Sequence, residues 1–124
     1  MILSKMAKHD IDLSLVFHAL SDPTRRAMLA QIGGGAVAVT VLARPTGLAL
    51  PTVMRHLSVL EAAGLIVTDK AGRSRLCRVQ PQTLTFAGDW LAQARAEWSA
   101  QTDRLEAFMN TMEEDNGPES RDRP

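Results

Sequence analysis

The chain has 124 residues, 45% of them hydrophobic, and its 14 basic and 14 acidic side chains leave no formal net charge. This length suits one domain with a single core, and neither a membrane-length apolar run nor the apolar region of a signal peptide is present. We therefore expect a cytoplasmic protein without membrane contact. Cys77 is the only cysteine, which excludes an intrachain disulfide and a cysteine pair for a metal.

The zero net charge hides an uneven distribution along the chain. Residues 113–124 contain five acidic and two basic side chains, a net charge of −3. Residues 44–80 contain six basic and two acidic side chains, a net charge of +4. The middle of the chain is therefore the part whose charge suits a nucleic acid.

Two helices are predicted at the start. Apolar side chains recur at helical spacing between residues 11 and 20, which indicates an amphipathic helix. Asp22 is a suitable N-cap for the next helix, and Pro23 favours its first position. That helix is expected to end at Ile32, because the three glycines at 33–35 favour irregular backbone.

A short strand and a short helix should follow. Residues 36–39 are partly β-branched and suit a minor strand. Thr40 is expected to cap a helix that ends near Arg44, because Pro45 and Gly47 prevent a longer one.

A longer helix is predicted over 51–63. Val53, Leu57 and Leu60 lie on one of its faces, and Gly64 suits the residue that follows its last turn. Because it comes after a short helix and a turn, this segment is expected to be the recognition helix of a helix-turn-helix.

A β-hairpin is predicted directly after the recognition helix. The runs 65–68 and 76–79 have strand composition, and residues 71–74, with Gly72, suit the turn between them. The fold class is therefore mainly α with a small β-hairpin wing.

Pro81 opens the last predicted helix, which carries an apolar heptad repeat. The residues spaced by seven are Leu84, Leu91, Trp98, Leu105 and Met112. Such a repeat predicts a helical partner. From residue 113 onward no apolar period remains, so we expect one winged helix-turn-helix domain over 1–112 and a disordered acidic, polar tail over 113–124.

One face of the predicted recognition helix is available to DNA. It carries the residues opposite the buried stripe, with His56 at the flank: Pro51, Thr52, Arg55, His56, Ser58 and Val59. An α-helix fits the major groove, where Arg55 could donate to O6 and N7 of guanine, Thr52 could contact a base, and His56 a phosphate or base.

The predicted wing adds a second basic cluster. Arg73 and Arg75 lie at the hairpin tip, backed by Lys70, where they could reach phosphates or the minor groove. Arg78 suits this role or that of an ordinary strand-face charge. The alternative for Thr52, Arg55 and His56 is the solvated face of an ordinary surface helix.

Three segments resemble the ArsR/SmtB family of regulators: ALSDPTRR (19–26), LPTV with RHL (50–57) and LEAAGLI (60–66). The resemblance spans residues 16–79. It implies a winged helix-turn-helix homodimer that represses transcription by binding the double-stranded DNA of a palindromic operator, with release by an unknown small-molecule inducer. It also implies that the first and last helices form the dimer interface, through Leu13, Phe17, Leu84, Leu91, Ala94, Trp98, Leu105 and Phe108.

Neither the metal sites of this family nor a cofactor is expected here. Residues 39–44 hold no cysteine pair and the last helix holds no histidine, whereas zinc needs about four ligands. A site built from His9, His18 and a nearby aspartate across a dimer stays open. So does a redox role for Cys77, whose basic neighbours could lower the thiol pKa.

An enzyme is not expected, because no nucleophile with a nearby base and no phosphate-binding loop is found. One alternative of another class remains. The heptad helix could bind a foreign helix in a protein-interaction module, with the basic face incidental.

Overall fold

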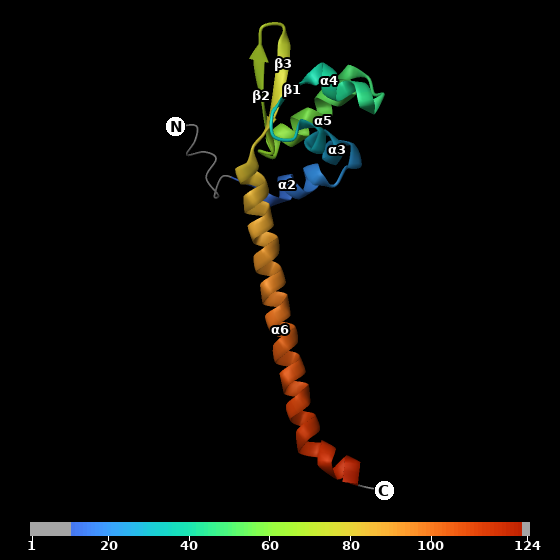
Figure 1. Cartoon of the computed structure of the whole chain (residues 1–124), viewed down its shortest axis with the longest axis vertical. Coiled ribbons are helices and arrows are strands. Elements are labelled where there is room, and N and C mark those ends of the chain that lie inside the picture. Colours follow the sequence, from blue (N-terminus) through green and yellow to red (C-terminus); the bar gives the residue numbers. More distant parts are fainter. Residues whose placement is uncertain (1–10, 123–124) are drawn as a thin grey trace. The chain divides into compact units, whose positions relative to one another are not determined.

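The computed structural model describes residues 11–122, with side chains from residue 11 to residue 114. The chain divides into two compact units, Met1–Ala87 and Gly88–Pro124. The elements of the first unit, in chain order, are α2 (Leu13–Leu20), α3 (Pro23–Ile32), β1 (Ala36–Ala38), α4 (Val39–Ala43), the 3-10 helix η2 (Arg44–Thr46), α5 (Leu50–Ala62), β2 (Ile66–Ala71), β3 (Ser74–Val79) and the start of α6 (Pro81–Asp122). Figure 1 shows α3, α4 and α5 beside the small sheet.

Aspartate caps fix the starts of α2 and α3. The Asp12 carboxylate accepts from the backbone N–H groups of Ser14 and Leu15, at 2.8 and 3.4 Å. The Asp22 carboxylate accepts from the backbone N–H of Arg25 at 3.0 Å, with Pro23 in the first turn. The predicted start of α3 is thereby confirmed.

The predicted cap of α4 is wrong. The N-cap is Ala38, which makes no side-chain hydrogen bond, and Thr40 lies inside the helix. Val39 is 6% exposed and belongs to the core. The burial of Val39 fixes the point at which the chain leaves β1, so α4 starts at Val39, one residue before Thr40.

Gly64 ends the recognition helix, as the sequence predicts. Its φ of 79° lies in the left-handed region that favours glycine. The next backbone N–H, of Leu65, turns back to donate to the Leu60 carbonyl at 3.0 Å. This closes α5 and directs the chain into β2.

The sheet has the order β1-β3-β2, with both pairs antiparallel. In the hairpin Ile66 faces Val79 and Ala71 faces Ser74. Gly72, with a φ of 62°, begins the turn. Both strands are longer than predicted, because backbone pairing continues through polar residues whose side chains carry no strand signal.

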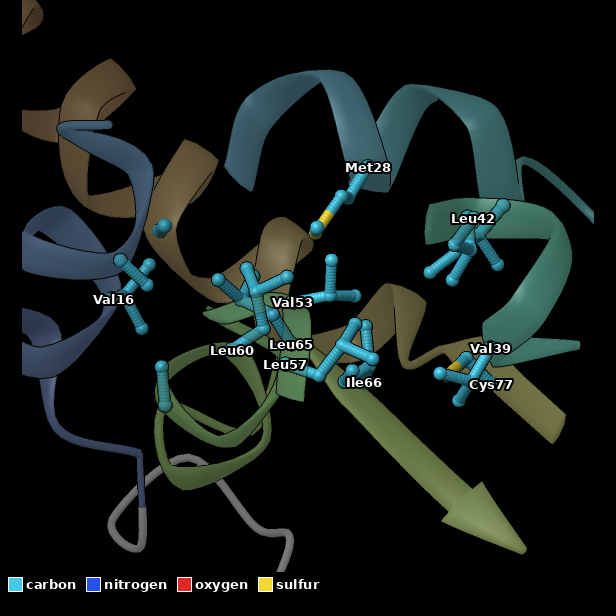
Figure 2. Close-up of a cluster of buried hydrophobic side chains, with 14 residues drawn as sticks. Val16, Met28, Val39, Leu42, Val53, Leu57, Leu60, Leu65, Ile66 and Cys77 are labelled. Atoms are coloured by element: carbon cyan, nitrogen blue, oxygen red, sulfur yellow. The ribbon is translucent and has the colours of Figure 1, made fainter. Parts of the chain in front are cut away.

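The core joins the helices to the sheet (Figure 2). Its buried apolar side chains include Val16, Ala19, Met28, Ile32, Val39, Leu42, Val53, Leu57, Leu60, Ala63, Leu65, Ile66, Cys77 and Ala87. The buried Thr83 hydroxyl at the start of α6 donates to the Gly64 carbonyl. The first turns of α6 are thereby held against the end of α5.

Helix α6 forms the second unit from Gly88 onward. Between residues 95 and 114 every side chain is exposed, including Trp98 at 75%. The helix runs to Asp122, past Met112, so residues 113–122, expected to be a disordered tail, are helical here. The separation of a tail from the domain at residue 113 stays a prediction. None of the described helices is long and apolar enough to cross a membrane.

Candidate nucleic-acid interface

Helix α5 has one buried and one exposed face. Val53, Leu57 and Leu60 are buried in the core, as predicted. Arg55 and Ser58 are exposed on the other side, and so is Pro51 in the first turn. The exposed side begins at the helix N-terminus, where the apolar Leu50 is exposed beside Pro51.

Three of the predicted DNA-facing residues lie along a half-buried flank of α5. Thr52, His56 and Val59 follow one another at helical spacing and have intermediate exposure. Val59 packs against the core cluster. The helical-wheel reasoning missed this because α2 and α3 both pack on α5, which widens the covered part of the helix.

His56 has a specific partner on α3. Arg25, which is only 8% exposed, directs its Nη1 group to His56 Nδ1 at 3.1 Å. The same guanidinium donates to the carbonyls of Ala19 and His18 at the end of α2, at 2.8 and 3.0 Å. The sequence does not predict this contact of Arg25, for which a phosphate or a carboxylate such as that of Glu61 is the expected partner, because the contact joins residues 31 positions apart and no local pattern records it.

The basic side chains of the wing differ in their freedom. Arg75 donates to the Thr68 hydroxyl at 3.0 Å, and this hydroxyl donates to a carboxylate oxygen of Glu61 at 3.2 Å. Arg75 is therefore held across the hairpin. Arg78 forms an ion pair with Asp69, which favours the strand-face interpretation of Arg78.

Lys70 and Arg73 remain available at the outer end of the hairpin. Both side chains are exposed. Within the described part of the chain, neither has a hydrogen-bond or ion-pair partner. These two cations can bind a phosphate without breaking an existing contact.

A groove brings the recognition helix and the wing tip together. Its volume is about 230 Å³, and it is lined by Ala38, Val39, Thr40, Leu50, Met54, Arg73, Ser74 and Arg75. The N-cap of α5, Ala49, makes no side-chain hydrogen bond. The positive end of the α5 dipole is therefore not capped by an acidic or hydroxyl side chain.

The thiol and metal alternatives gain no support. Cys77 is fully buried, and this burial raises the pKa of its thiol above the ordinary value. That is opposite to the lowered pKa a redox role needs. His9 lies outside the described residues, and among those described no cluster of three His, Cys, Asp or Glu side chains could hold a metal.

Comparisons with known proteins agree with this geometry. A family model described as a helix-turn-helix domain matches residues 20–69. The chain is 38% identical over 68 residues to the HTH-type transcriptional regulator Rv2034 of Mycobacterium tuberculosis; the match covers 55% of this chain and 64% of that protein's length. A crystal structure titled as an ArsR family transcriptional regulator has 41% identity and a TM-score of 0.67, with 70% of this chain and 90% of that chain covered. The chain belongs to the ArsR family.

A second ArsR-like structure comes from Mycobacterium bovis. It is titled the homodimeric winged helix-turn-helix DNA-binding domain of Mb0332, a possible ArsR-family regulator. It has 28% identity and a TM-score of 0.55, and the match covers 68% of this chain and 78% of that chain. ArsR-family proteins are transcriptional regulators, a class that is normally not enzymatic. The three segments that resemble the ArsR/SmtB family lie on the end of α2, on α3, on α5 and at the start of β2.

Proposed function

We propose that this ArsR-family chain is a cytoplasmic, sequence-specific DNA-binding repressor that acts as a homodimer at a palindromic operator, without a catalytic step. One observation carries the proposal. Leu50 and Met54 of α5 line one groove with Arg73 and Arg75 of the wing tip, while Val53, Leu57 and Leu60 anchor the opposite side of α5 in the core. A helix held in this way can enter the major groove while the wing follows the backbone.

Base recognition is assigned to the exposed residues near the start of α5. Arg55 can donate two parallel hydrogen bonds to O6 and N7 of guanine. Thr52, half-buried one turn earlier, can contact a neighbouring base or a thymine methyl group. Pro51 and Ser58 lie on the exposed face beside them, and the uncapped helix N-terminus favours a phosphate.

Backbone binding is assigned chiefly to Lys70 and Arg73, whose cations are free. Arg75 contributes positive charge to the same groove while its side chain stays on Thr68. Val59 contributes by packing α5 on the core.

The homodimer is assigned to α2 and α6, which expose apolar surface. The exposed fractions are 36% for Phe17, 41% for Leu84, 51% for Leu91, 75% for Trp98, 59% for Leu105 and 60% for Phe108, with Leu13 and Ala94 half-buried. A second copy would cover these side chains, as the homodimeric state named for the Mycobacterium bovis relative suggests. From the family resemblance we also propose that the bound dimer represses transcription and that a small-molecule inducer releases it from DNA.

Selection of duplexes from a random pool tests the proposal. The protein should enrich a two-fold-symmetric sequence, and its affinity for that duplex should fall steeply with salt because phosphate contacts release counterions. A shuffled duplex of equal composition is the control. Equal retardation of both duplexes at all salt concentrations would contradict sequence-specific binding.

A further inference from the structure

The buried Arg25 has an unusual set of partners. Its guanidinium donates to two carbonyls at the C-terminal end of α2, His18 O and Ala19 O, and to one ring nitrogen of His56. The carbonyl end of a helix carries partial negative charge, which stabilises the cation. No carboxylate accepts a hydrogen bond from this guanidinium in the described part of the chain.

This contact defines the hydrogen-bonding character of His56. A guanidinium has only donors, so His56 Nδ1 must accept with its lone pair. A neutral imidazole whose Nδ1 accepts carries its proton on Nε2. The half-exposed ring therefore offers an N–H donor at Nε2, which has no protein partner among the described residues.

We propose that Arg25 is a positioning residue for DNA recognition, because it holds His56 as an Nε2–H donor that can contact only hydrogen-bond acceptors on DNA. The inference rests on the proposed function. The acceptors available are purine N7, guanine O6, thymine O4 and phosphate oxygens, whereas the amino groups of cytosine and adenine are donors. Arg25 also links the end of α2, a proposed interface helix, to the recognition helix α5.

A double-mutant cycle tests whether Arg25 acts through His56. On the selected duplex we expect His56→Ala and Arg25→Met each to weaken binding about tenfold. The first removes the Nε2–H donor from both subunits, and the second releases the ring from the orientation and tautomer that present this donor to DNA. The double variant should be no more than about twofold weaker than His56→Ala alone. A double variant weaker than wild type by the product of the two single losses, about a hundredfold, would overturn the proposal.

Arg26→Met is the matched control for Arg25→Met. Arg26 is the exposed neighbour, and it donates to the Leu20 carbonyl without contacting His56. The Arg26→Met variant should bind the selected duplex with the same affinity as the wild type. Thermal unfolding identifies a folding defect, and if Arg25→Met does not fold, Arg25→Lys takes its place in the cycle because it keeps a cation at the α2 carbonyls.

Nitrogen-15 spectra of the histidine rings give a readout that a purely structural role would not change. The His56 signals are assigned as those that disappear from the spectrum of His56→Ala. In the wild type they should show an unprotonated Nδ1 and a protonated Nε2. Arg25→Met should convert this pattern to a mixture of tautomers. A proton on Nδ1 in the wild type, or an unchanged pattern in the variant, would contradict the proposal.

Modified duplexes distinguish the two sources of an acceptor. Replacing guanine by 7-deazaguanine removes a base acceptor, and a methylphosphonate linkage weakens a phosphate acceptor. One of these changes, made at a single position of each half-site, should weaken the wild type but not His56→Ala. If the wild type selects no duplex at all, the proposed function fails, whereas selection with an additive cycle refutes only the role of Arg25.

Discussion

Trp98→Glu is the substitution that most directly tests the proposed dimer. Trp98 is 75% exposed on α6 and belongs to the heptad repeat. A tryptophan buries about 200 Å², so about 150 Å² of its surface remains for a partner to cover. At about 25 cal/mol per Å² this area corresponds to about 4 kcal/mol per subunit.

The effect on association follows from two copies of the side chain. If the dimer covers half of the exposed area, each Trp98 contributes about 2 kcal/mol and the pair about 4 kcal/mol. Loss of this contribution raises the dimer dissociation constant about a thousandfold. The buried charge of the glutamate increases the loss further.

Sedimentation equilibrium over a wide concentration range measures this dissociation constant. Ala100→Glu is the matched control, because it adds the same charge at an exposed position outside the heptad repeat. We expect Trp98→Glu to be monomeric at concentrations where the wild type and Ala100→Glu are dimeric. Equal dissociation constants for all three proteins would refute the assignment of α6 as an interface.

Three further predictions test the proposed DNA-binding residues, the core and a helix cap. Arg55→Ala should weaken binding to the selected duplex by roughly 1 to 3 kcal/mol and relax one base preference per half-site, whereas Arg73→Ala should weaken binding to all duplexes alike; identical selectivity profiles would count against the two roles. Cys77, fully buried with a raised thiol pKa, should react with iodoacetamide much more slowly in the native protein than in urea, and equal rates would refute its burial. The backbone N–H of Arg25 that donates to Asp22 lowers the pKa of this carboxyl, so its stabilising effect is present at neutral pH and lost as the pH falls through the folded-state pKa. Asp22→Asn should therefore flatten the acid limb of the thermal stability profile, and an unchanged limb would contradict the cap.

The sequence predicts the elements whose signals are local. Asp22 with Pro23 identifies the start of α3, and Gly64 identifies the end of α5. These residues act through the backbone of their own segment, so a pattern of a few residues contains the information. The same is true of the wing, whose turn at Gly72 the sequence places within one four-residue stretch.

Features that depend on distant segments were missed or misplaced. The Arg25–His56 contact and the bond from Arg75 to Thr68 depend on how α3, α5 and the hairpin pack. Val59 has an outward position on an isolated helix and becomes half-buried only because other helices cover that flank. Side-chain periodicity describes one helix at a time, so it cannot show which flank a neighbour covers.

Protection of guanine N7 from methylation by dimethyl sulfate tests the central claim most directly, because N7 lies in the major groove where Arg55 is proposed to bind. On the selected duplex the wild type should protect at least one guanine in each half-site. Arg55→Ala should lose that protection and keep the protection of other positions. Full methylation of every guanine in the wild-type complex, or a pattern unaffected by Arg55→Ala, would show that α5 does not read the major groove in this way.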